Sequence, residues 1–146
     1  FPATPDGGPT NRYAAGTFAF LSADRDSDGL PSDWESTNGL NPADPSDSLS
    51  DLDSDGSSNL SEFAAGTDPR NAASTFRITS ASISANTITV RFPLAANRKA
   101  SLQSSPDLIF WSEAQSVTAT ASPRDISLSI PANQNTRFLR VAASLP

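Results

Sequence analysis

The feature that most constrains the fold of this chain is a strongly acidic stretch between residues 24 and 68. It holds 12 Asp or Glu residues and a single basic residue, Arg25, so its net charge is −11. Its apolar residues are isolated Leu, Trp and Phe side chains, which are too few for an ordinary hydrophobic core. Because the carboxylates repel one another, this stretch is either disordered or held together by a cation.

Two twelve-residue loops within this stretch share one pattern. The first runs from Asp24 to Glu35 and the second, 27 residues further on, from Asp51 to Glu62. Each has Asp at positions 1, 3 and 5, Gly at position 6 and Glu at position 12, which is the spacing of an EF-hand-type calcium loop. Acidic turns rich in Asp and Gly are the alternative interpretation, but two complete loops in one chain favour calcium.

The spacing also assigns a ligand to each position. Calcium takes roughly six to eight hard oxygen ligands, which here are three alternate carboxylates, the position 7 carbonyl, position 9 directly or through water, and the closing Glu. Gly29 and Gly56 permit the sharp turn between them. We therefore expect two calcium ions per chain as the only cofactors. The predicted ligands are Asp24, Asp26, Asp28, Leu30, Ser32, Glu35, Asp51, Asp53, Asp55, Ser57, Asn59 and Glu62.

Paired EF-hands fit the surroundings of these loops less well. Position 8, whose backbone normally pairs the two loops, is Pro31 in the first loop and has no N–H to donate. Short helices are expected after the loops, at about 32–38 and 58–65, and they should end near Gly39 and Gly66.

Several residues around the loops allow two interpretations. Asp44, Asp47 and Asp68 lie outside the twelve-residue pattern. They either cap helices or complete coordination spheres if the loops pack together. Trp34 and Phe63 adjoin the last ligand of each loop, where they form a small core beneath the sites or stand exposed for a partner. We favour the core.

With these motifs in place, residues 24–70 resemble the thrombospondin type 3-like calcium repeats of bacterial secreted proteins. The likeness rests on the two loops together with Gly39-Leu-Asn-Pro42 and Gly66-Thr-Asp-Pro69, and it covers about a third of the chain. It implies calcium-dependent rigid spacers rather than catalysts, often beside β-sandwich domains. One departure is Ser32, where the repeats often carry Asp, which implies a weaker first site.

In residues 71–146, apolar and polar residues alternate in short runs, as is typical of β-strands. Seven runs, at 76–84, 86–92, 98–104, 108–115, 116–121, 124–130 and 136–142, predict an antiparallel β-sandwich of the immunoglobulin or fibronectin III kind. Residues 1–23 are expected to form an extended segment with one possible strand at 13–21 that completes the sandwich. Two of the runs have clear core-facing residues. These are Ile88, Val90, Phe92, Ile126, Leu128 and Ile130.

Composition excludes several function classes. Cys, His and Met are absent, which excludes disulfide bonds, thiolate or imidazole metal sites, and triads that use an imidazole base. The net charge of −6 disfavours nucleic acid as a partner, and no apolar run approaches the ~20 residues that span a bilayer. Nearly all acids have metal-ligand spacing, not the apolar surroundings of a general acid, so we expect no enzyme activity.

The sequence as a whole predicts an extracellular, non-catalytic calcium-binding spacer with an attached β-sandwich, within a secreted or cell-surface protein or assembly. Extracellular calcium modules work at dissociation constants of roughly 10⁻⁴–10⁻³ M, and the sandwich should fold without the ion. Two alternatives remain at this point. One is a calcium-stabilised module that binds extracellular glycans through Phe110 and Trp111. The other is a subunit that exchanges its N-terminal strand with copies of itself.

Overall fold

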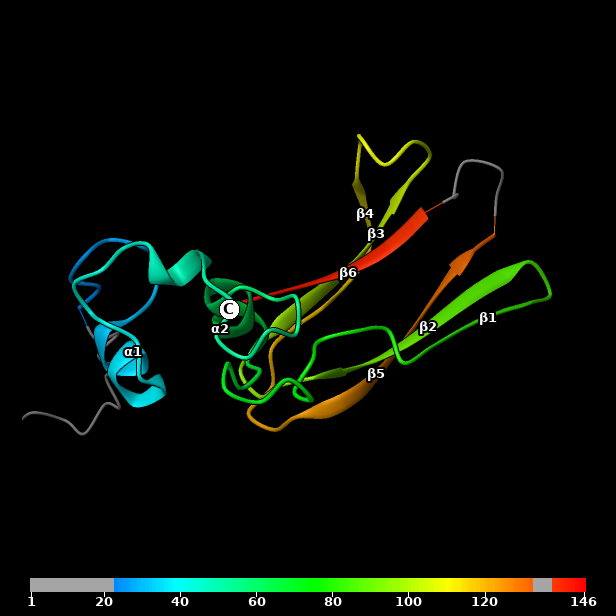
Figure 1. The fold of residues 1–146 in the computed structure, drawn as a ribbon. Coiled ribbons are helices and arrows are strands. Elements are labelled where there is room, and N and C mark those ends of the chain that lie inside the picture. Colours follow the sequence, from blue (N-terminus) through cyan, green and yellow to red (C-terminus); the bar gives the residue numbers. More distant parts are fainter. Residues whose placement is uncertain (1–22, 133–137) are drawn as a thin grey trace, which may run out of the picture.

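The computed structural model describes residues 23–132 and 138–146, and it divides into an acidic segment, residues 23–70, and a strand region, residues 76–146 (Figure 1). Figure 1 shows the acidic segment on one side, the strands on the other and α2 between them. The elements are α1 (Ser32–Asn38), η1 (Asp47–Leu49), α2 (Asn59–Ala65), β1 (Ser80–Ser84), β2 (Thr87–Leu94), β3 (Lys99–Ser105), β4 (Ser112–Val117), β5 (Arg124–Pro131) and β6 (Phe138–Ser144).

Both expected helices are present, and each begins and ends within a residue of its expected bounds. α2 begins after Ser58, whose side chain accepts a hydrogen bond from the Ser61 N–H, as an N-cap residue does. The helices end at Gly39 and Gly66, which have φ angles of 80° and 78°. Glycine adopts this left-handed conformation without the steric cost of a Cβ atom.

The strands form two three-stranded sheets, β1-β2-β5 and β4-β3-β6. All paired strands are antiparallel. Ala85 and Asn86 join β1 to β2, and both have positive φ angles, 45° and 60°. A two-residue connection of this kind matches the right-handed twist of the flanking strands. The strand region is therefore an antiparallel β structure, as expected.

The two sheets share one apolar core. Its buried members come from β2, β3 and β5, and half-buried residues of β4 and β6 pack against them. Phe76 meets Phe92 edge to face with ring centroids 5.8 Å apart. The predicted core faces of β2 and β5 are confirmed, with Ile88 and Leu128 only half-buried. The buried set is Val90, Phe92, Leu94, Ala100, Leu102, Ile126 and Ile130.

The expected number of strands is wrong in one region. The runs at 108–115 and 116–121 predicted two strands, but residues 106–111 form a turn and one strand, β4, follows. The Asp107 carboxylate accepts hydrogen bonds from the N–H groups of Ile109 and Phe110, and Leu108 has a φ of 68°. This local bonding by Asp favours a turn over a strand. The described residues thus contain six strands, and the expected strand at 13–21 lies outside them.

The acidic segment contacts the strand region through α2. Arg98, in the turn between β2 and β3, donates a 2.7 Å hydrogen bond from Nη2 to the Phe63 carbonyl, and its guanidinium lies 5.7 Å from the Phe63 ring centroid. The same ring meets Trp34 of α1 edge to face, with 5.2 Å between centroids. Phe63 therefore connects both helices to the strand region, in agreement with the packing interpretation of Trp34 and Phe63.

Among the described residues, no helix is both long enough and apolar enough to cross a membrane.

Candidate metal centre

The first loop is organised from within by the carboxylate of Asp24. Its Oδ1 accepts hydrogen bonds from the N–H groups of Ser27 (2.7 Å) and Asp28 (3.2 Å), and its Oδ2 accepts one from Gly29 (3.0 Å). Ser27 and Gly29 have φ angles of 64° and 97°. The chain therefore curls around the carboxylate at position 1.

The second loop repeats this geometry atom for atom. Asp51 Oδ1 accepts from Ser54 (2.8 Å) and Asp55 (3.2 Å), and Oδ2 accepts from Gly56 (2.8 Å). The φ angles of Ser54 and Gly56 are 64° and 96°. The two six-residue stretches differ only at position 2, Arg25 against Leu52, and adopt one backbone conformation, which is therefore determined by the residues that they share.

The acidic segment brings carboxylate oxygens together in three groups. Within each group, one oxygen from every member lies within 4.8 Å of the others. Oxygens bound to one calcium at about 2.3–2.6 Å are separated by distances of this size. The groups are Asp24 with Asp26 and Asp28, Asp28 with Glu35 and Asp47, and Asp51 with Asp53 and Asp55.

Buried polar atoms without hydrogen-bond partners are concentrated at these loops. Of 11 such side-chain atoms in the described residues, ten are oxygens of the acidic segment, and the other is Arg98 Nε. A buried oxygen with no partner is costly, more so when it carries charge, whereas a bound cation satisfies it. The oxygens are both of Asp26, Asp28 Oδ2, both of Glu35, Asp47 Oδ1, Asp53 Oδ2, Asp55 Oδ2, Asn59 Oδ1 and Glu62 Oε2. The donor set therefore fits a hard metal ion.

The two closing glutamates are the most deeply buried acids. Glu35 is 0% exposed and Glu62 is 1% exposed. Burial, and then the nearby carboxylates of Asp26 and Asp28, raise the pKa of Glu35 to about 7. Burial also raises the pKa of Glu62, although a hydrogen bond from the Thr67 hydroxyl opposes this shift. Both glutamates are thus placed where their negative charge is unfavourable without a cation.

Position 7 makes the same hydrogen bond in both loops, whereas position 9 differs between them. At position 7, the N–H of Leu30 donates to Asp28 Oδ1 and that of Ser57 donates to Asp55 Oδ1. At position 9, the Ser32 hydroxyl accepts a hydrogen bond from the backbone N–H of Arg25. Asn59 is fully buried and its Oδ1 has no partner. Asn59 thus offers a free oxygen, whereas the Ser32 hydroxyl is already engaged within the loop.

The three acids outside the loops have separate roles. Asp44 accepts hydrogen bonds from the N–H and hydroxyl of Ser46, which lower its pKa. Asp68 accepts from the Arg70 N–H and lies 3.8 Å from the Arg70 guanidinium. Asp47 alone of the three joins a carboxylate group. Its membership depends on how η1 packs against the first loop, and the loop spacing carries no signal of it.

Glu62 is not a member of the group formed by the three aspartates of its own loop. Those aspartates nevertheless contribute to the raised pKa of Glu62, after burial, so the side chains face the same region. In the first loop, Asp28 is shared by the group of the three aspartates and the group that contains Glu35, whereas in the second loop only the three aspartates are grouped.

Comparisons of this chain with protein-family models, with curated proteins and with solved structures find no match. The resemblance to thrombospondin type 3-like repeats therefore stays a prediction, and the case for the candidate site rests on its own geometry.

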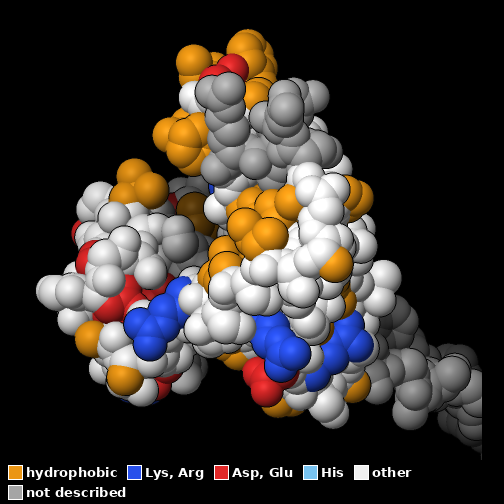
Figure 2. Space-filling model, turned by 90° about the vertical axis from the view of Figure 1, so that its right-hand side faces the viewer, with side chains coloured by type: hydrophobic (Ala, Val, Ile, Leu, Met, Phe, Trp, Pro, Cys, Tyr) orange, Lys and Arg blue, Asp and Glu red, His pale blue; other side chains and the backbone are white. Residues whose placement is uncertain are grey.

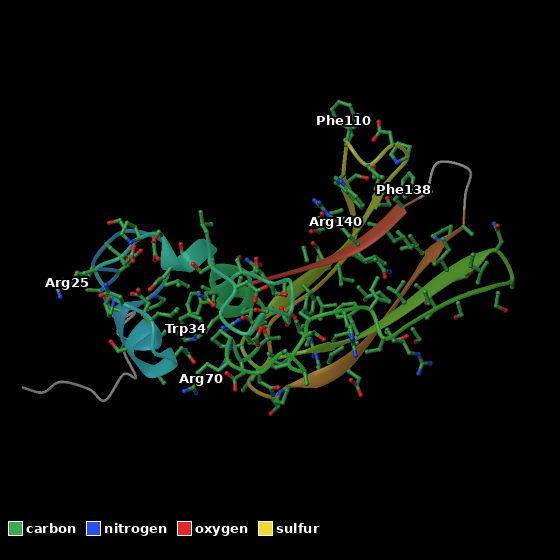
Figure 3. All side chains as sticks on the ribbon, in the orientation of Figure 1. Arg25, Trp34, Arg70, Phe110, Phe138 and Arg140 are labelled. Carbon is green, nitrogen blue, oxygen red and sulfur yellow. The ribbon has the colours of Figure 1, made fainter. Side chains whose placement is uncertain are left out.

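The aromatic pair considered for glycan binding lies at the far end of the strand region, in the turn before β4. Phe110 lies at the tip of this turn and is 74% exposed (Figure 3). Trp111 donates its indole N–H to the Leu108 carbonyl, and the Arg140 guanidinium lies 4.2 Å from its ring centroid. Figure 2 shows hydrophobic side chains gathered at this end. Trp111 thus has its N–H and one ring face in use, whereas the Phe110 ring is exposed, and glycan binding by this pair stays a prediction.

The raised pKa of Glu35 predicts that the binding of a metal ion at the first loop would be coupled to proton release. A metal ion binds the ionised carboxylate, so its affinity for the first loop should fall as the pH drops through about 7. Without metal, the free energy of unfolding depends on pH in the opposite direction. Because the pKa of Glu35 is raised in the folded protein, the fold loses stability as the pH rises from 4.5 to about 7. Calorimetry in two buffers of different ionisation enthalpy should detect proton release near pH 6.5 and much less at pH 8.

Two variants assign this proton release to its source. Glu35→Gln should remove most of it, whereas Glu113→Gln, which changes an exposed glutamate of β4, should leave it unchanged. Equal proton release in Glu35→Gln and in the unmodified protein would contradict the assignment.

Proposed function

We propose that the acidic segment binds two calcium ions, one in each loop, and acts as an extracellular, non-catalytic structural spacer for the attached β-sandwich. The observation that carries this proposal is the concentration of buried, unpartnered oxygens at two loops of the same conformation. No other part of the described chain gathers such atoms.

The donor chemistry supports calcium over other metal ions. All candidate side-chain donors are oxygens, mostly carboxylate, which suit hard cations and not the softer transition metals. Magnesium demands near-ideal octahedral geometry and keeps several waters, whereas calcium accepts many protein oxygens with loose angular demands. Loops that offer three or more carboxylates per site match the requirements of calcium. Each loop carries a formal charge of −4 from these positions, so two ions would change the net charge from −6 to −2.

The contacts of α2 support the spacer role. Glu62 closes the second loop, and the next residue, Phe63, receives the Arg98 hydrogen bond from the strand region. An ion that holds Glu62 would therefore order the helix that fixes the strand region relative to the loops. Trp34 packs on the same Phe63 ring, so the first loop is included in this arrangement.

The strand order supports an immunoglobulin-like sandwich for the attached region. In that family of folds, the first, second and fifth strands share one sheet, and the third strand pairs with the sixth in the other. The orders β1-β2-β5 and β4-β3-β6 follow this scheme. Such sandwiches occur widely on cell surfaces, which agrees with the proposed extracellular setting. Localisation of the native protein to the cytosol would argue against that setting.

Calorimetric titration of the full chain with calcium tests the proposal directly. We expect two sites in the unmodified protein. Changing Asp28→Ala and Asp55→Ala together should abolish or strongly weaken both, because each removes a carboxylate with a buried, unpartnered oxygen.

The matched control is Glu113→Ala with Asp125→Ala, which removes two exposed carboxylates of the strand region and should leave both sites intact. Fewer than two sites in the unmodified protein, or equal losses in the two double variants, would refute the proposal.

A further inference from the structure

A short 3-10 turn, η1, separates the two loops and contacts both. Its first residue, Asp47, directs its side chain toward the first loop. Asp47 Oδ2 accepts a 2.8 Å hydrogen bond from the Asn41 N–H. The other oxygen, Oδ1, is buried without a partner, and a carboxylate oxygen of Asp47 lies within 4.8 Å of oxygens of Asp28 and Glu35. Glu35 is itself fully buried with both oxygens unpartnered. Asp47 thus offers the first site a carboxylate from outside its twelve residues.

The backbone of the same residue contacts the second loop. The Asp47 carbonyl accepts a 2.7 Å hydrogen bond from Asn59 Nδ2, and the Asn59 N–H donates to the Ser50 carbonyl at 2.8 Å. Asn59 occupies position 9 of the second loop and is fully buried. Because its amide nitrogen is held by η1, its amide oxygen is the free end, and that oxygen has no partner.

We propose that η1 couples the two metal sites. Asp47 supplies a carboxylate oxygen to the first ion, and its carbonyl holds Asn59 in place as a ligand of the second, so the binding of either ion favours the binding of the other. This inference rests on the proposed function, because it requires both loops to bind metal.

The sign of the coupling follows from conformational order. Fixing η1 and its side chains costs entropy, and whichever ion binds first bears that cost for both sites. Charge alone predicts the opposite, because a bound divalent cation repels a second one nearby. Positive cooperativity is therefore a signature that electrostatics cannot produce. We expect the second ion to bind about fivefold or more tightly than the first, after statistical correction, which is the lower end of typical coupling between sites.

The test is an equilibrium calcium titration of the full chain with a competing chelator, which resolves the two stepwise constants. Asn59→Asp keeps an oxygen at position 9 but removes the N–H donor to the Asp47 carbonyl. We expect this variant to bind two ions without positive cooperativity. Asn71→Asp is the matched control, since Asn71 is exposed and outside the loops. It adds the same charge and should leave the cooperativity unchanged.

Asp47→Ala tests whether the Asp47 carboxylate is a ligand of the first ion, and it provides an independent test if Asn59→Asp does not fold. It removes the carboxylate but keeps the carbonyl that holds Asn59, so it should weaken the first ion at least fivefold and reduce the cooperativity.

The outcomes separate the inference from the proposed function. Fewer than two ions bound by the unmodified chain would refute the proposed function. Two ions bound without positive cooperativity, cooperativity that survives in Asn59→Asp, or unchanged affinity in Asp47→Ala would overturn the coupling and leave the two calcium sites standing.

Discussion

Removal of calcium should make residues 24–65 readily cleavable by protease and leave the core strands β2, β3 and β5 protected. The reason lies in what each part buries. In the acidic segment, the buried side chains are mostly polar, and Leu30, Ala65 and Pro69 are its buried apolar ones. Ordering each residue costs roughly 1–2 kcal/mol of backbone entropy, which so little apolar burial cannot offset. Calcium ions bound as proposed would stabilise only the folded loops, by an amount that grows with the logarithm of free calcium.

The strand region has its own source of stability. Seven buried apolar residues from both sheets form its core, and each fully buried large side chain contributes roughly 1.5–3 kcal/mol. Removing the ions takes nothing from that core. The expected change is therefore confined to the loops, α1, η1 and α2, and to the α2 contact with Arg98.

Limited digestion with chymotrypsin, with calcium and with a chelator, measures this difference. Cleavage after Trp34 and Phe63 should appear only with the chelator, because both rings are half-buried against each other in the folded segment. Phe110, which is exposed in a turn, provides an internal control that should be cut at the same rate in both conditions. Equal resistance of Trp34 and Phe63 in the two digests would show that calcium does not organise this segment.

The parts of the structure that local sequence determines could be predicted closely. The Asp and Gly spacing predicted two equivalent loops, and the glycines at 39 and 66 predicted the ends of α1 and α2. Alternation of apolar residues predicted the buried faces of β2 and β5. In each case the decisive contacts join residues a few positions apart or follow a simple period of two.

Contacts between distant segments could not be predicted in this way. Asp47 joins the first site because η1 packs beside Glu35, and no spacing rule places it there. Arg98 reaches the Phe63 carbonyl from 35 residues away. The strand prediction for residues 108–111 is wrong for a different reason. The apolar run Leu108-Ile-Phe110 has strand character, but the Asp107 carboxylate accepts hydrogen bonds from the local N–H groups, and these bonds favour the turn.

The tight contact between α2 and the strand region gives the second large expected effect, at Gly66. A Cβ atom at this residue would lie 2.8 Å from the Cβ of Ala95 and 3.4 Å from Nε of Arg98. Gly66→Ala should therefore push α2 away from the β2–β3 turn and break the Arg98 hydrogen bond to Phe63. Overpacking of this kind costs about 1–3 kcal/mol, in addition to about 1–2 kcal/mol for a left-handed alanine.

Gly39 provides a matched control for the backbone part of this cost. It ends α1 with a φ of 80°, against 78° for Gly66, and a Cβ atom there would meet nothing within 4 Å. Gly39→Ala should thus lower the free energy of unfolding only by the cost of a left-handed alanine. The difference between the two variants, measured by denaturant unfolding in saturating calcium, isolates the steric cost at the α2 contact.

Hydrogen exchange of the backbone N–H groups locates the part of the structure that is destabilised in each variant. In Gly66→Ala, faster exchange should extend to the β2–β3 turn, residues 95–98, because the atoms that α2 covers there become accessible. In Gly39→Ala it should stay near the end of α1. Equal losses of unfolding free energy in the two variants, with no change at the turn, would mean that this contact does not fix the position of α2 on the strand region. The ordering of the second loop would then have no rigid connection to the strand region.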